Sequence, residues 1–127
     1  MQDNDRSAII KIGDEEYQLI LTTKATKEIA KRYGGLENLG TKLMKTENFE
    51  MALDEVVWLI TLLANQSILI HTLKHQDKRE LLTEETVELL TSPLELAAYK
   101  DAIMEAMFKG TKRNVESEDD LKNTPAE

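Results

Sequence analysis

Two histidines have the spacing of a helical metal site. His71 and His75 are four residues apart, so on a helix both imidazoles would lie on one face, as in zinc sites built on helices. Two ligands do not make a site, and the glutamate that follows the first histidine in zinc-protease motifs is missing here. The neighbouring Lys74, Lys78 and Arg79 would repel a cation. We therefore interpret both histidines as surface residues near a helix end, and we expect no metal and no cofactor.

Two acidic pairs are the residues best suited to acid–base catalysis. The pairs are Asp54–Glu55 and Glu84–Glu85, but such chemistry needs convergent groups in a dry pocket with separated pKa values. Acids in the first turn of a helix stabilise its positive end, which accounts for both pairs. The chain has no Cys, which excludes a thiol nucleophile, a cysteine zinc site and a disulfide. The sequence predicts no catalytic residue and favours a binding or assembly protein over an enzyme.

Phosphate and nucleic-acid binding are also disfavoured. Gly34 and Gly35 lack the lysine and hydroxyl residue of a phosphate loop and follow a helical pattern, so they indicate a helix stop. One predicted helix has a basic face, but Glu28 lies within that face and is spaced to pair with Arg32. A net charge of −8 would repel a phosphate backbone. We interpret that face as solvated; its basic residues are Lys24, Lys27, Lys31 and Arg32.

The most informative segment is residues 56–63, which are apolar on every face of a helix. Such a helix is covered either by the rest of the chain alone or partly by another chain. The wider apolar stretch 56–70 contains Asn65 and Gln66 and is shorter than the roughly 20 residues of a membrane span, so we expect a core helix. The candidate partner-binding residues are Ile9, Ile20, Val57, Trp58 and Leu62.

The elements that position these residues begin with a β-hairpin. Segments 7–13 and 16–22 read as strands separated by turn-forming residues. Alternation predicts one apolar face, and the hairpin should dock on the helices through it. Ile9 and Ile20 put apolar groups on the second face, which helices or a second copy of the hairpin would cover. The first face comprises Ala8, Ile10, Ile12, Tyr17, Leu19 and Leu21.

Helical patterns fill most of the remaining chain. The sequence Ser92-Pro93-Leu94-Glu95 is a capping box with proline at the first helical position, which predicts the start of the last helix. Gly110 should lie just past its end. The predicted helices are 24–33, a short or irregular one at 36–44, a long one from Phe49 after Asn48 to about Lys74, a weaker one at 84–91, and the last at 93–109.

The fold class that follows is α+β, mainly α, with an N-terminal β-hairpin followed by a bundle of about four to five helices. Residues 7–110 form one domain, residues 1–6 a flexible N-terminus, and residues 111–127 a charged, disordered tail because they contain few apolar groups. The polar, acidic N-terminal segment differs from a signal peptide. We therefore expect a cytoplasmic protein.

This order of elements resembles the small tail assembly chaperones of long-tailed bacteriophages and prophages. The residues that carry the resemblance lie within about 8–109: Ile10-Lys11-Ile12-Gly13, Tyr17-Gln18-Leu19-Ile20-Leu21-Thr22, Lys27-Glu28-Ile29, Tyr33-Gly34-Gly35-Leu36 and the helix around Trp58. The family implies a non-enzymatic protein of the host cytoplasm that binds and solubilises the tape measure protein, helps recruit tail tube protein, and is absent from the mature virion. It fixes no binding residue in this chain.

Other functions stay open at this point. A small helical adaptor or regulatory interaction protein unrelated to tails, such as an antitoxin-like partner, has the same composition and element order. A nucleic-acid-binding regulator and an enzyme are further alternatives. Self-association is expected, because a small helical protein that assembles can offer apolar grooves repeatedly to a long partner. The acidic surface would keep such an assembly soluble.

Overall fold

A computed structural model describes residues 7–39, 49–76 and 79–126 of the chain. It has an antiparallel hairpin of β1 (Ser7–Ile12) and β2 (Glu15–Ile20), followed by α1 (Thr23–Tyr33), α3 (Phe49–His75), α4 (Glu84–Leu90) and α5 (Pro93–Ala126). Residues 36–39 are also helical, and the rest of the helix predicted at 36–44 lies outside the described residues. The predicted class, mainly α with an N-terminal hairpin, is confirmed.

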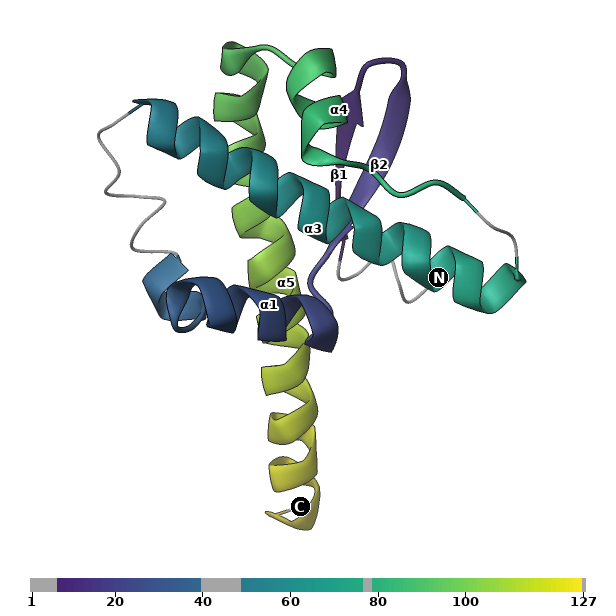
Figure 1. Cartoon of the computed structure of the whole chain (residues 1–127). Coiled ribbons are helices and arrows are strands. Elements are labelled where there is room, and N and C mark those ends of the chain that lie inside the picture. The colour runs from purple at the N-terminus through teal and green to yellow at the C-terminus, as the bar shows by residue number, and fades with distance from the viewer. Residues whose placement is uncertain (1–6, 40–48, 77–78, 127) are drawn as a thin grey trace.

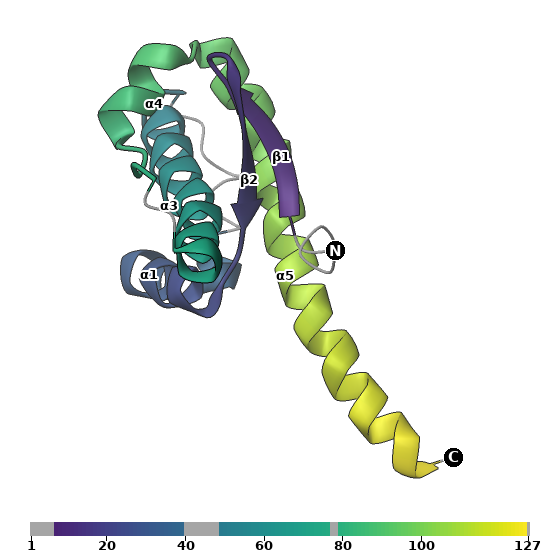
Figure 2. The ribbon, with the colours of Figure 1, turned by 90° about the vertical axis from the view of Figure 1, so that its right-hand side faces the viewer.

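The hairpin lies between the two long helices. Figure 2 shows α3 on one side of the strands and α5 on the other; β2 contacts chiefly α3, and β1 contacts α5. The pairing places Ala8 opposite Leu19 and Ile10 opposite Tyr17, as alternation predicts. The predicted apolar face is buried except for Tyr17, which is partly buried. On the second face Ile9 is 59% exposed.

The helix boundaries follow local capping signals. The Thr22 hydroxyl accepts from the Ala25 N–H, and Gly34 ends α1 in the left-handed conformation. Before α5, the Ser92 N–H donates to the Glu95 carboxylate and the Glu95 N–H donates to the Ser92 hydroxyl, at 2.9 and 3.3 Å. This reciprocal pair is the predicted capping box.

The end of α5 corrects the sequence prediction. The helix continues through Gly110 to Ala126, so the stop predicted after Lys109 is wrong. Gly110 is buried, and a Cβ there would lie 2.9 Å from the Leu21 Cβ. Glycine therefore lets α5 approach the end of β2 closely and does not end the helix. Residues 111–126, predicted as a disordered tail, extend a helix that is already nucleated.

Polar contacts fasten α5 to β1. The Lys109 ammonium donates to the Ser7 carbonyl at 3.0 Å, and the Tyr99 hydroxyl donates to the Lys11 carbonyl. Burial, and then the Glu95 carboxylate, raises the pKa of Tyr99 above its ordinary value, so this phenol is a donor at neutral pH. The hairpin and α5 together form the rear wall behind α3 (Figure 1).

Candidate partner-binding site

One side of α3 packs into the core and the other is open. Buried residues include Val56, Leu59, Ile60 and Leu63, whereas the opposite side carries apolar residues spaced every four or seven positions. Such spacing places them in one stripe along the helix. In this open stripe Trp58 and Leu62 are half-buried, Leu69 is 38% exposed and Leu73 is 80% exposed.

The open stripe forms the floor of a groove between two helices. In Figure 1, α3 runs across the front of the molecule with α1 below it and α4 above it. A hollow of about 290 Å³ there has Lys24 and Glu28 of α1 on one side, and Leu81 and Glu84 on the other. Because its floor is mainly apolar and its rims carry charges, we call this hollow the α3 groove. Its floor comprises Trp58, Thr61, Leu62, Asn65, Gln66 and Leu69.

Two amides on α3 hold the flanks of the groove in place. The Asn65 side chain accepts from the Leu82 N–H at 2.7 Å and donates to the Leu82 carbonyl at 3.0 Å, so it clamps the segment that leads into α4. On the other flank, the Thr22 hydroxyl donates to the Gln66 carbonyl oxygen at 2.5 Å. The polar residues that interrupt the apolar stretch thus position both walls of the groove.

Aromatic and charged contacts orient Trp58. The guanidinium of Arg32 lies 4.4 Å from the centre of the Trp58 ring, and the Tyr33 ring meets Trp58 edge-on with centres 5.9 Å apart. Glu55, which is 8% exposed, accepts from the Tyr33 hydroxyl and lies 3.7 Å from the Arg32 Nε. The end of α1 therefore fixes the indole at one end of the α3 groove.

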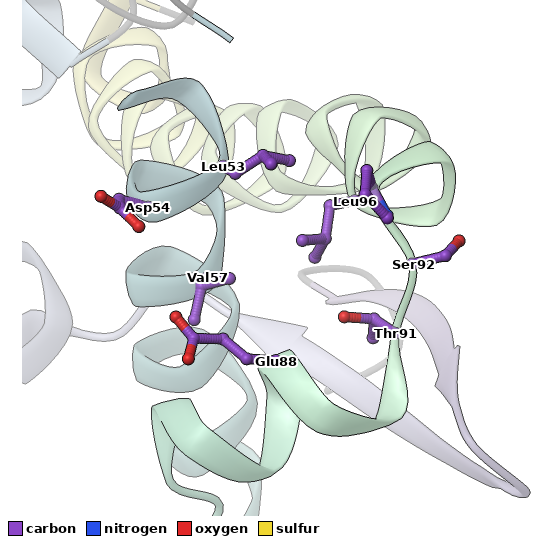
Figure 3. Close-up of a pocket in the computed structure, with 8 residues that line it drawn as sticks. Leu53, Asp54, Val57, Glu88, Thr91, Ser92 and Leu96 are labelled. Atoms are coloured by element: carbon purple, nitrogen blue, oxygen red, sulfur yellow. The ribbon is translucent and has the colours of Figure 1, made fainter. Parts of the chain in front are cut away.

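A second hollow lies between the first turns of α3 and the α4–α5 corner (Figure 3). It measures about 340 Å³, and we call it the corner pocket. Leu53 and Val57 of α3 line it together with Leu96 of α5, and two exposed acids, Asp54 and Glu88, stand at its rim. Thr91, Ser92 and Pro93 complete the lining.

No protein-family model, curated protein or solved structure matches the chain.

The five predicted partner-binding residues lie at different places. Trp58 and Leu62 are together on the floor of the α3 groove. Val57 is 2% exposed and lines the corner pocket. Ile9 is exposed beside another hollow, next to Ile68 and Arg79. Ile20 is 2% exposed and is a core residue of the single chain.

The structure adds two apolar residues to the groove, Leu69 and Leu81, and a third, Leu73, to the open stripe beyond it; the sequence prediction missed all three. A signal for two of them was present, because Leu62, Leu69 and Leu73 continue the helical spacing that begins at Trp58. No local signal identified Leu81, which the Asn65 clamp on the adjoining Leu82 holds beside α3.

The two histidines at the end of α3 lie side by side. The ring centres of His71 and His75 are 4.4 Å apart, and within the described ranges no group of three or more potential metal ligands occurs.

The segment Leu53–His75 is long and apolar enough to cross a membrane by length and composition. Its inner residues belong to the same core as the hairpin and α5, which favours the core-helix interpretation.

Proposed function

We propose that this protein is a non-enzymatic tail assembly chaperone that binds helical segments of a phage or prophage tape measure protein in its α3 groove. The observation that carries the proposal is the open apolar stripe of α3, which is flanked by α1 and α4 but covered by neither along Leu69 and Leu73. The sequence resemblance identifies the partner, and the groove supplies a surface that such a partner needs. A small helical adaptor with another partner is the alternative.

The groove suits a helical partner for physical reasons. An amphipathic helix binds by placing its apolar residues, spaced three or four apart, into an apolar groove. One domain covers only about 20–30 residues of a partner at an interface of standard size, so a long partner would take several copies. In this proposal, the copies self-associate along the tape measure protein in the host cytoplasm, the tail tube protein then assembles, and the chaperone leaves before the virion is complete.

Co-expression with the tape measure protein from the same locus tests the proposal. We expect the wild-type chain to keep that protein soluble and to copurify in several copies. The double variant Leu69→Glu/Leu73→Glu should lose at least about 90% of the copurified partner, because two charges would enter an apolar interface. Both positions are exposed in the free chain, so its melting temperature should stay within a few degrees.

The matched control is Leu89→Glu/Leu94→Glu, which puts two charges at leucines that are 76% and 82% exposed outside the groove. It should leave copurification unchanged. Equal loss in both variants would show that general surface hydrophobicity, and not the α3 groove, captures the partner. If the tape measure protein stays insoluble with wild type, and the chain instead binds one compact protein at one-to-one stoichiometry, the adaptor function replaces the chaperone function.

A further inference from the structure

The corner pocket combines an apolar lining with an acidic rim. Leu53, Val57 and Leu96 surround the hollow, as Figure 3 shows. Asp54 and Glu88 come from different helices, α3 and α4, and both belong to the lining. In Figure 3 the Glu88 side chain extends toward Val57, and the Asp54 carboxylate lies on the side of α3 away from Leu53 and Leu96. Within the part of the chain that the structure describes, neither carboxylate has a basic partner within ion-pair distance. The lining therefore carries two negative charges that a cation on a bound molecule would neutralise.

The hydroxyl groups of the pocket are already engaged. Thr91 donates to the Val87 carbonyl at 2.6 Å, and Ser92 belongs to the capping box of α5. A bare metal ion would need several free oxygen ligands, and the hydroxyls on this side do not supply them. The pocket instead matches a ligand with an apolar stem and one cationic head.

We propose that the corner pocket takes a lysine or arginine side chain of the partner helix, with the methylene stem on Leu53, Val57 and Leu96 and the cationic head between Asp54 and Glu88. Lysine and arginine side chains bury their methylene stems on apolar surface while the charged head stays in contact with water. Asp54 lies one helical turn before Trp58 on the same side of α3, so we expect a partner helix that extends past Trp58 to come next to Asp54. The identity of the partner rests on the proposed function; the chemistry of the pocket does not.

The pocket can be tested without the partner by NMR titration of the full chain. The probe is n-butylguanidinium, with neutral 1-pentanol as its control. We expect saturable shifts of the methyl signals of Leu53, Val57 and Leu96, with a dissociation constant on the order of 10 mM, as for other fragments of this size. Pentanol should shift these signals much less, because it lacks the charge.

Variants separate the local charges from the overall charge. Asp54→Asn/Glu88→Gln should weaken butylguanidinium binding by about fivefold or more, since two ion pairs are lost. The control Glu85→Gln/Asp101→Asn changes the net charge equally at exposed positions that do not line the pocket, and should bind like wild type. The proposal is overturned if no saturable shift appears at the pocket methyls, if pentanol binds equally well, or if Asp54→Asn/Glu88→Gln binds like wild type.

An array of overlapping 20-residue peptides from the tape measure protein distinguishes this inference from the proposed function. Wild type should bind peptides that carry Lys or Arg one turn from an apolar residue, and Asp54→Asn/Glu88→Gln should lose them. If wild type binds peptides and the variant binds the same ones equally, the pocket inference fails and the function stands. If no peptide binds while butylguanidinium does, the function fails and the pocket stands.

Discussion

The residues around Trp58 join the end of α1 to α3. Arg32 contributes a cation–π contact to Trp58 and an ion pair to Glu55, and Tyr33 contributes a ring contact and a hydroxyl donor. Because Glu55 is nearly buried, the donors that reach its carboxylate offset the cost of removing the charge from water. The same contacts hold the indole at the groove. Trp58, which lies in a segment predicted as either core or interface, is half-buried and lines the α3 groove.

Removal of the Tyr33 hydroxyl tests this arrangement. Tyr33→Phe deletes a hydrogen bond to a nearly buried carboxylate and should lower the free energy of unfolding by about 1–3 kcal/mol. The matched control is Tyr17→Phe, whose hydroxyl donates to the Glu15 carboxylate at 3.1 Å in an exposed position. That change should stay within about 0.5 kcal/mol. Urea unfolding followed by the fluorescence of the single tryptophan measures both; equal losses would contradict the special role of Glu55.

At the level of elements, the approach of α5 to the end of β2 shapes the core. Gly110 lies directly against Leu21, because its missing side chain leaves room for the Leu21 side chain. The glycine thus allows α5 to dock against Leu21.

A Gly110→Ala substitution measures this docking. Alanine is favoured over glycine within a helix by about 1 kcal/mol, but its Cβ would lie 2.9 Å from the Leu21 Cβ, which cannot rotate away. We expect a net loss of about 1–3 kcal/mol in urea unfolding, as for other overpacked cores. The reverse change at an exposed site on the same helix, Ala97→Gly, should also destabilise, by about 1 kcal/mol. A stabilised Gly110→Ala would show that α5 does not pack against Leu21.

Elements with local signals were predictable from the sequence, whereas contacts between distant residues were not. The hairpin alternation, the Gly34 stop and the Ser92–Glu95 capping box depend on residues within a few positions of one another, and all three appear in the structure. Gly110 has the local context of a helix stop, but its role depends on Leu21, which is far away in the sequence. Tertiary packing overrode the local signal there.

The candidate site shows the same division. Helical spacing could place Trp58 and Leu62 on one stripe, but which stripe of an apolar helix stays open depends on where α1 and α4 pack. The corner pocket requires α3, α4 and α5 together, so neither Asp54 nor Glu88 could be assigned to it from its neighbours in the sequence. The sequence pattern assigns Asp54, together with Glu55, to a helix N-terminus, and Glu88 belongs to neither of the two acidic pairs.

At the level of the whole molecule, the core and the protruding helix are distinct. One core cluster joins residues of the hairpin, α1, α3, α4 and the first part of α5. Figures 1 and 2 show the C-terminal part of α5 extending away from this body, with no other element beside it. The core and the elements around it should therefore fold without residues 111–127.

Truncation after Gly110 is expected to leave the melting temperature within a few degrees of the full chain, because a loss of about 1 kcal/mol would already shift a domain of this size by several degrees. Circular dichroism should show less total helix but an unchanged transition. The matched control ends after Ala102 and deletes Ile103, Ala106 and Met107, which are 0%, 0% and 7% exposed. Each large buried side chain contributes about 2–5 kcal/mol, and domains are stable by only about 5–15 kcal/mol. The chain that ends after Ala102 should therefore lose its cooperative transition.

A large drop in melting temperature on truncation after Gly110 would mean that residues 111–127 stabilise the rest of the fold. A cooperative transition without residues 103–127 would place the core elsewhere.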